Sequence, residues 1–348
     1  MSIGVIGEIC GLNLARMPRM DAINRRELLQ MTAVLAAVGM SGRPVAAASS
    51  TFAAGVGGQA AENPGNTLRF FPGFKAARVK TSGAEINLVH AGSGPPLLLM
   101  HGAPQTHVSM RLIAGELAKD YTVVVPDLRG YGDSSKPADG ENHANYSKRA
   151  MALDQVEVMK SFGFDKFAVV GHDRGGRVGH RMALDHADKV TRLAVLDIIP
   201  TYYLYTHVTI EFIQSYFHWF NNVRPAPGPE NDIKAQTEAQ KARATAEVQI
   251  EYLLTSSLPE NIHAMCEDYR AGASIDLKHD VADLSRRVAC PLMTLWGLKG
   301  PMGRIYDVLA IWKERGVNVT GKGLPGGHNL QEDVPADVLA ELRPFLKG

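Results

Sequence analysis

Hydrophobic residues in this chain gather in short, unbroken runs, separated by stretches in which apolar and polar residues mix. Strands that are apolar along their whole length are buried on both faces, which is typical of parallel sheets covered by helices. The sequence therefore predicts central strands of such a sheet, over residues 96–100, 121–127, 167–170, 193–197 and 292–296.

An earlier stretch, 85–90, alternates polar and apolar residues, as a strand with one solvent-facing side does. The segments between the runs are typical of helices, over 110–118, 146–162 and 176–186. Strands that alternate with helices form an α/β fold in which right-handed crossovers connect parallel strands. The predicted fold class is thus α/β, a mostly parallel sheet flanked by helices.

The alternation stops between residues 200 and 287. Aromatic residues crowd the start of this stretch, prolines follow at 225–229, and residues 234–254 are rich in helix-favouring Ala, Gln, Glu and Lys. We expect a helical cap over 200–287, inserted into an α/β core formed by 68–199 and 288–348. Ligands bind open α/β sheets at the carboxyl ends of the strands, so the cap is expected to close the binding site.

Residues 1–48 have the pattern of an export signal. Arg25 and Arg26 precede a mildly apolar stretch, 28–40, and a run of alanines follows, which resembles a twin-arginine signal. The apolar stretch is too short to span a bilayer, so no membrane association is expected of the mature form. Residues 49–67, rich in Gly, Ala and Ser, predict a flexible linker. We expect a periplasmic or secreted protein, or a cytoplasmic one if the signal is not used.

The overall composition is that of an ordinary globular protein. The chain has 348 residues, 45% of them hydrophobic and 21% charged, with a formal net charge of +1. This near-neutral balance gives no reason to expect nucleic acid or an anionic membrane as a partner. The three cysteines, Cys10, Cys266 and Cys290, show neither metal-ligand spacing nor a disulfide framework.

The stretch VVGHDRGGR, residues 169–177, joins a predicted strand to a predicted helix. Many hydrolases have Gly-x-Ser-x-Gly at such a turn, with the serine as nucleophile. Here the glycines are Gly171 and Gly175, and Asp173 takes the place of the serine. An ionised carboxylate attacks a saturated carbon that bears a leaving group, and the product is an ester. By itself Asp173 would equally fit a solvated turn, so the catalytic interpretation depends on its partners.

Water must clear such an ester, and that step requires a base. The Gly-rich loop 324–328 supplies His328, and Asp197, at the end of the next apolar strand, is the expected acid that orients it, although a helix cap is the alternative. The order nucleophile, acid, base is the one that such hydrolases have. The main-chain N–H groups of Ala103 and Arg174 are expected to form an oxyanion hole.

Two arginines stand beside the proposed nucleophile. Arg174 and Arg177 are three residues apart, about one helical turn, so both can face the same cavity mouth. Planar guanidinium groups hold a carboxylate through paired, charge-assisted hydrogen bonds. The pair therefore indicates a small anionic substrate, whereas ion pairs on a helix surface, for instance with Asp185, would be the structural alternative.

The strings HDRGGR, LDIIPTY, DLRGYGDSSKP, YFHWF and DYRAG, within a region from about residue 70 to the C-terminus, resemble the fluoroacetate (haloacetate) dehalogenases of the α/β-hydrolase superfamily. The resemblance implies an α/β-hydrolase fold. It further implies that Asp173 is the nucleophile, Asp197 the acid and His328 the base. In this family the two arginines of the first string bind the substrate carboxylate, which corresponds to Arg174 and Arg177.

The resemblance also implies a halide pocket in the cap, formed by His218, Trp219 and, less directly, Tyr269. Ring N–H and phenol O–H groups are donors that could replace the water around a departing fluoride. The family usually has an aromatic residue where this chain has Ala103, and the smaller side chain predicts a wider pocket.

Together these features predict a hydrolytic dehalogenase that converts a small 2-haloacid into the 2-hydroxy acid and halide, with neither a metal nor an organic cofactor. An epoxide hydrolase with the same aspartate and histidine is the alternative, which cap tyrosines Tyr202, Tyr203 and Tyr205 keep open. However, Arg174 stands where epoxide hydrolases commonly have tryptophan. A non-catalytic binding protein of the same fold is a further alternative, and a homodimer is left open.

Overall fold

The computed structural model describes residues 64–348. The predicted export signal over 1–48, and most of the predicted linker over 49–67, lie outside the described residues. The first described element is the 3-10 helix η2 (Pro64–Phe70), so regular structure is present at the end of the predicted linker. None of the helices in the described region has the length and apolar character needed to cross a membrane.

An eight-stranded, mostly parallel sheet forms the centre of the described region and confirms the predicted fold class. Its strands are β1 (Lys75–Lys80), β2 (Glu85–Ala91), β3 (Pro96–Met100), β4 (Thr122–Pro126), β5 (Phe167–His172), β6 (Val190–Leu196), β7 (Leu292–Gly297) and β8 (Val319–Leu324). Their spatial order is β1-β2-β4-β3-β5-β6-β7-β8. Strand β2 is antiparallel to both of its neighbours, and the pairs from β4 to β8 are parallel.

Both faces of the sheet are covered, which explains why the central strands are apolar throughout. Successive residues of β5 point to opposite sides: Val169 packs in a core cluster with Met151 and Val178, and Val170 packs in another with Ile113 and Leu342. Besides η2, the described helices and 3-10 helices outside the cap are η3 (His107–Met110), α3 (Arg111–Leu117), η4 (Glu141–Tyr146), α4 (Lys148–Ser161), α5 (Arg174–Asp185), α13 (Met302–Ile305), α14 (Val308–Arg315), α15 (Leu330–Asp333) and α16 (Pro335–Lys347).

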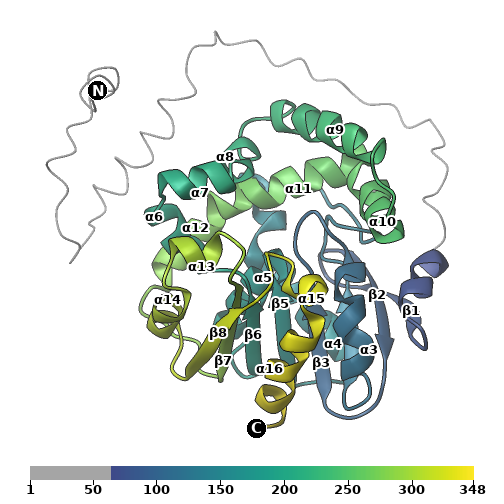
Figure 1. Cartoon of the computed structure of the whole chain (residues 1–348), viewed down its shortest axis with the longest axis vertical. Coiled ribbons are helices and arrows are strands. Elements are labelled where there is room, and N and C mark those ends of the chain that lie inside the picture. Colours follow the sequence, from purple (N-terminus) through teal and green to yellow (C-terminus); the bar gives the residue numbers. More distant parts are fainter. Residues whose placement is uncertain (1–63) are drawn as a thin grey trace, which may run out of the picture. The chain divides into compact units, whose positions relative to one another are not determined.

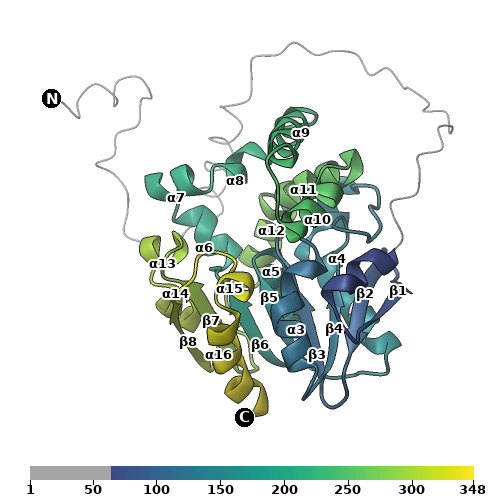
Figure 2. The ribbon, with the colours of Figure 1, turned by 45° about the vertical axis from the view of Figure 1, so that its right-hand side comes forward.

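Between β6 and β7 the chain leaves the sheet and forms a group of helices above the ends of the strands (Figures 1 and 2). They are α6 (Thr201–Thr206), α7 (Ile210–Ser215), α8 (His218–Asn221), α9 (Gly228–Lys241), α10 (Glu247–Ser256), α11 (Pro259–Gly272) and α12 (Ile275–Ala282). Because β5 and β6 run parallel, the residues that follow both strands emerge at the same edge, beneath these helices.

The helix-favouring segment 234–254 is divided between two helices, because α9 ends at Lys241 and α10 begins at Glu247. Helix propensity alone would favour continuing through the alanine-rich segment between them. Instead α10 is bound to the core, where Glu247 and Glu251 form ion pairs with Arg69 at 2.6 and 2.9 Å. A tertiary contact therefore overrides the local preference.

Candidate active site

Asp173 stands in a sharp turn between β5 and α5. Its φ of +43° and ψ of −113° are strained for a residue with a side chain. The flanking glycines allow the turn: a Cβ at Gly171 would lie 2.4 Å from the carbonyl oxygen of Gly175, and a Cβ at Gly175 would lie 2.5 Å from that of Met100. The turn projects the carboxylate into a cavity beneath the cap.

One oxygen of the Asp173 carboxylate accepts a main-chain hydrogen bond. The main-chain N–H of Ala103 donates to Asp173 Oδ2 at 3.1 Å, whereas Oδ1 accepts no hydrogen bond within residues 64–348. Burial favours the neutral acid, but the nearby charges of His328 and Arg174 hold the pKa of Asp173 well below its usual range. The side chain is therefore an ionised carboxylate with one oxygen available for attack.

The imidazole of His328 lies in the loop between β8 and α15, next to Asp197. Its Nδ1 is 2.6 Å from Asp197 Oδ2, and Asp197 Oδ1 accepts the main-chain N–H of Gly297 at 2.8 Å. Asp197 is fully buried, with a φ of +53°. A carboxylate accepts from Nδ1–H, so Nε2 is the nitrogen left to act as a base. Burial opposes protonation of His328, but the hydrogen bond to Asp197 and the charge of Asp173 outweigh it and raise its pKa.

Arg174 and Arg177 are both buried, and their guanidinium groups lie over the ring of Trp219, which lines the cavity. The Arg174 guanidinium carbon is 3.6 Å from the ring centroid of Tyr269 and 4.6 Å from that of Trp219. Its Nε is 3.5 Å from Asp268 Oδ2, yet none of its three side-chain nitrogens makes a hydrogen bond with the described part of the chain. Buried donors without acceptors are rare and costly.

Arg177 is anchored at one end. Its Nη1 donates to Ile199 O and to Thr201 Oγ1, each at 3.0 Å, whereas its Nε makes no hydrogen bond with any described residue. Its guanidinium carbon is 4.5 Å from the Trp219 ring centroid. Burial lowers the pKa of Arg177 to about 10, so it is still charged at neutral pH. Asp185, the ion-pair partner considered from the sequence, instead binds Arg149 and Arg181.

The three cap residues predicted to bind halide come together around the same cavity. His218 lies on α8 with Trp219, and Tyr269 lies on α11; the Tyr269 ring centroid is 5.6 Å from that of His218 and 5.7 Å from that of Trp219. Burial lowers the pKa of His218 to about 4, so its ring is neutral and has one N–H. All three residues line the cavity together with Asp173 and His328.

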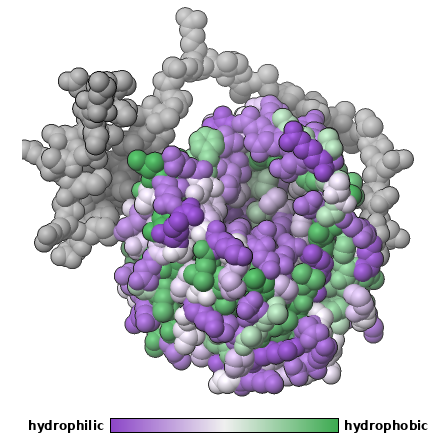
Figure 3. Space-filling view, in the orientation of Figure 1, coloured by the Kyte–Doolittle hydropathy of each residue, from purple (hydrophilic) through white to green (hydrophobic). Residues whose placement is uncertain are grey.

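This cavity has a volume of about 1200 Å³ and lies between the cap and the ends of the strands. The hollow in the upper half of the surface in Figure 3 leads into it. Ala103 is part of its wall beside Asp173, and the far wall is formed by α9 and α10, with polar residues such as Gln236 and Gln240. Drug-sized ligands occupy pockets of about 300–1,000 Å³, so the space greatly exceeds the needs of a haloacetate.

Sequence reasoning missed several residues around this site. Tyr216 lines the cavity near the expected base and an expected halide-binding residue, with its ring centroid 6.0 Å from that of His328 and 5.7 Å from that of His218. Asp268 accepts the Tyr131 O–H at 2.6 Å and also pairs with Lys148. The DYRAG string contains Asp268, but nothing in the sequence indicates that it reaches Arg174.

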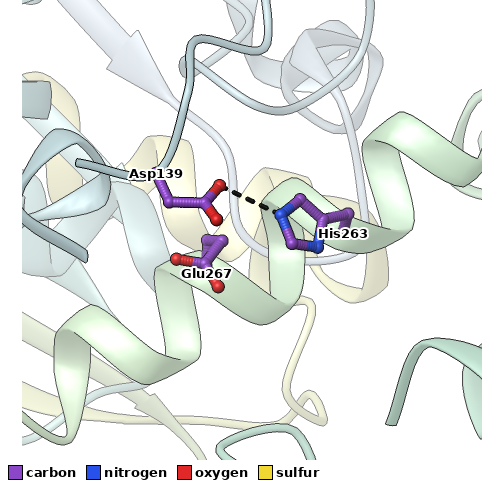
Figure 4. A group of neighbouring side chains, drawn as sticks. All are labelled: Asp139, His263 and Glu267. Atoms are coloured by element: carbon purple, nitrogen blue, oxygen red, sulfur yellow. Dashed lines mark hydrogen bonds and ion pairs between the residues drawn. The ribbon is translucent and has the colours of Figure 1, made fainter. Parts of the chain in front are cut away.

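A separate cluster of potential metal ligands joins the cap to the core. Carboxylate or ring atoms of Asp139, His263 and Glu267 all lie within 4.8 Å of one another (Figure 4). Each already has a protein partner: His263 contacts Asp139 at 3.0 Å and Glu230 at 3.2 Å, and Glu267 accepts from Arg270 at 2.8 Å. None of the first three residues lines the cavity. Because its members already have partners within the protein, the cluster forms a network of ion pairs that links α11 to the loop before η4.

The alpha/beta hydrolase fold family matches residues 95–333 of this chain. A fluoroacetate dehalogenase from Burkholderia sp is 45% identical, over 79% of this chain and 95% of that protein. A soluble epoxide hydrolase from a Corynebacterium species is 32% identical, over 74% of this chain and 92% of that protein. The crystal structure of a proposed α/β hydrolase from Nostoc sp PCC 7120, 49% identical, superposes with a TM-score of 0.77 over 80% of this chain and 99% of that one. The chain belongs to the α/β-hydrolase fold family and, within it, to the haloacetate dehalogenases.

Proposed function

We propose that this hydrolase cleaves the carbon–halogen bond of a small 2-haloacid through an ester on Asp173. The observation that carries the proposal is the buried guanidinium of Arg174, whose Nε lies 3.5 Å from Asp268 Oδ2, beyond the usual hydrogen-bond length, so that its donors are poorly satisfied by the described residues. A substrate carboxylate is the acceptor that suits such a group best. Arg177, with its Nε also unpaired, supplies a second positive charge beside the ionised Asp173.

In the first step, Asp173 Oδ1 attacks the carbon that bears the halogen. A carbon–oxygen bond forms, and the carbon–halogen bond breaks with its electron pair on the departing halide. The neutral His218 ring, the Trp219 indole and the Tyr269 phenol border the same cavity and offer N–H and O–H donors to the anion. The two arginines hold the carboxylate and offset its repulsion from Asp173.

In the second step, His328 Nε2 removes a proton from water, and the hydroxide attacks the carboxyl carbon of Asp173. The negative charge that develops on the carbonyl oxygen is stabilised by the Ala103 N–H, which already contacts Oδ2. The tetrahedral intermediate then collapses, and the bond between the Asp173 carboxyl carbon and the ester oxygen breaks. That oxygen takes the proton from His328 and leaves as the hydroxyl of the 2-hydroxy acid, and the new Asp173 carboxyl group loses its proton to restore the carboxylate. Over the two steps, the haloacid and water are converted into the hydroxy acid, a halide ion and a proton.

Epoxide hydrolysis is the second candidate, favoured by the Corynebacterium relative and by two cap tyrosines, one buried and one half-buried. The O–H groups of Tyr205 and Tyr216 have no hydrogen-bond partner in the described region, and an epoxide oxygen could accept from them. However, burial raises the pKa of both tyrosines, which makes them weaker acids. A neutral epoxide would also leave Arg174 with Asp268, at 3.5 Å, as its only carboxylate partner among the described residues, so we favour the haloacid.

The test is a parallel assay of chloroacetate and styrene oxide with the wild type and with Arg177→Met. Arg177→Met removes a positive charge that binds the substrate carboxylate, which an epoxide lacks, so kcat/KM for chloroacetate should fall by about 100-fold or more while styrene oxide hydrolysis changes far less. Arg149→Met, at an exposed ion pair, is the matched control. Equal losses of kcat/KM on both substrates would contradict the binding of the substrate carboxylate by Arg177.

A further inference from the structure

His172, the residue immediately before the nucleophile, connects the main chain of the nucleophile to that of the base. It ends β5 and is fully buried. Its Nε2 lies 2.9 Å from the carbonyl oxygen of His328, and its Nδ1 lies 3.3 Å from Nε2 of Gln331, itself fully buried. The proposed mechanism assigns no role to either His172 or Gln331.

The contacts determine which ring nitrogen carries the proton. A carbonyl oxygen only accepts, so the His172 nitrogen that faces it must be Nε2–H. Burial and the neighbouring His328 lower the pKa of His172 to about 3, so the ring is neutral and has one proton. Nδ1 is then an acceptor, and the Gln331 side chain donates its amide N–H to it. The two hydrogen bonds thus form one directed chain, from Gln331 to His172 to the His328 carbonyl.

The loop that carries His328 needs such an anchor. Asp197 holds the imidazole of His328, but it does not hold the main chain. Asp333 accepts the Gly327 N–H at 2.8 Å, and a Cβ at Gly297 would lie 2.0 Å from Gly327 O, so the loop packs closely on the end of β7. The bond from His172 is the contact that ties this loop to the nucleophile turn itself.

We propose that His172, oriented by Gln331, is a positioning residue that sets the distance between the base and the ester on Asp173. The proposal rests on the two-step function above, in which His328 acts only in ester hydrolysis. Loss of the hydrogen bond therefore slows the second step and leaves the first unchanged. A merely structural role would affect both steps through folding.

A near-isosteric pair of variants tests this. His172→Gln places a side-chain N–H where it can still donate to the His328 carbonyl, and His172→Met has a similar size without a donor. Rapid-quench chloride release with chloroacetate reports ester formation, and intact-mass decay of the ester reports hydrolysis. We expect a full first-turnover chloride burst in both. Ester decay should slow at least about tenfold in His172→Met and stay within about threefold of wild type in His172→Gln.

Equal ester decay in the two variants, or an equal loss of both steps, would overturn the positioning role. If no ester forms in these variants or in His328→Ala, the proposed function fails instead, so the two failures are distinguishable. Nitrogen-15 NMR of histidine-labelled wild type gives a readout that needs no variant to fold. His172 should show a protonated Nε2 and an unprotonated Nδ1, and the reverse assignment would contradict the hydrogen-bond chain.

Discussion

The Nδ1 atom of His328 lies 2.6 Å from Asp197 Oδ2, although 131 residues separate the two along the chain. Asp197 is held in turn by the main-chain N–H of Gly297, so the acid is fixed by the strand next to its own. The result is an imidazole whose Nε2 and a carboxylate whose Oδ1 make no hydrogen bond within residues 64–348, both in one cavity. This relationship separates the roles of nucleophile and base.

Replacing Asp197 tests whether the nucleophile Asp173 and the base His328 act in separate steps. Asp197→Asn keeps the shape but offers an amide N–H to His328, which favours the wrong tautomer, so ester hydrolysis should fall by about 100- to 10,000-fold. Ester formation should be nearly unchanged, and the trapped ester should be visible by intact-mass spectrometry. Asp165→Asn, at an exposed position, is the matched control. A variant that turns over at the wild-type rate without trapped ester would exclude Asp197 as the acid.

The pH dependence of the two steps should differ. The charge of Asp173 contributes to the raised pKa of His328, and ester formation removes that charge, so the pKa of His328 should fall once the ester has formed. Hydrolysis needs neutral His328 and is lost as pH falls through this pKa, whereas ester formation needs only ionised Asp173, whose pKa is far lower.

From about pH 9 down to about pH 5, the chloride burst should therefore persist while steady-state turnover declines and the ester accumulates. Stopped-flow chloride release and quenched intact mass at each pH measure the two steps. If the burst and the steady state declined together, the base would be acting before the ester forms.

Pocket width should depend on Ala103, which lines the cavity beside Asp173. Ala103→Phe fills space next to the nucleophile and should lower kcat/KM for 2-chloropropionate relative to chloroacetate by about tenfold. Ala242→Phe makes the same change at an exposed position that does not line the cavity. The ratio of the two kcat/KM values is the measurement, and an unchanged ratio would show that Ala103 does not limit substrate size.

The ion pairs that link α11 to the core should make stability depend on pH. Burial opposes charge on His263, but its hydrogen bonds to Asp139 and Glu230 outweigh this and raise its pKa. The stabilisation is complete below the pKa of His263 in the unfolded chain and is lost as pH rises through the folded-state pKa.

The difference in unfolding free energy between wild type and His263→Gln should therefore shrink from about pH 5 to about pH 9. Urea titrations followed by circular dichroism at each pH provide the measurement. The control is His186→Gln, because His186 forms no ion pair with the described residues. A difference that grows with pH would mean that His263 is not stabilised as a cation.

Much of the fold could be predicted because its central strands are buried on both faces and so are apolar throughout. The two edge strands could not. Strand β1 has the sequence KAARVK, and all its residues are exposed or half-buried, so it has no apolar run. Strand β8 has the sequence VTGKGL, in which two glycines interrupt the apolar residues. In β8, a Cβ at Gly321 would lie 2.1 Å from Thr294 O, so the glycine serves close packing that no local pattern reveals.

In the active site, too, some residues could be predicted from the sequence and others could not. Asp173 and His328 could be predicted because each lies in a Gly-rich turn, and Asp197 because it ends the next apolar strand; their order along the chain matches that of such hydrolases. His172 and Tyr216 were missed because their contacts with His328 depend on how distant segments fold together. The positions of residues on a turn can be inferred locally, whereas their neighbours across the cavity cannot.

The most direct test of the central claim is a single turnover of chloroacetate in 18O-labelled water, with excess enzyme. If water attacks the carboxyl carbon of an ester on Asp173, the label enters the Asp173 side chain, and the glycolate carries unlabelled oxygen from the enzyme. Peptide mass spectrometry of the segment containing Asp173 and of the product measures both. Label in the glycolate alone, with none in Asp173, would contradict the ester mechanism.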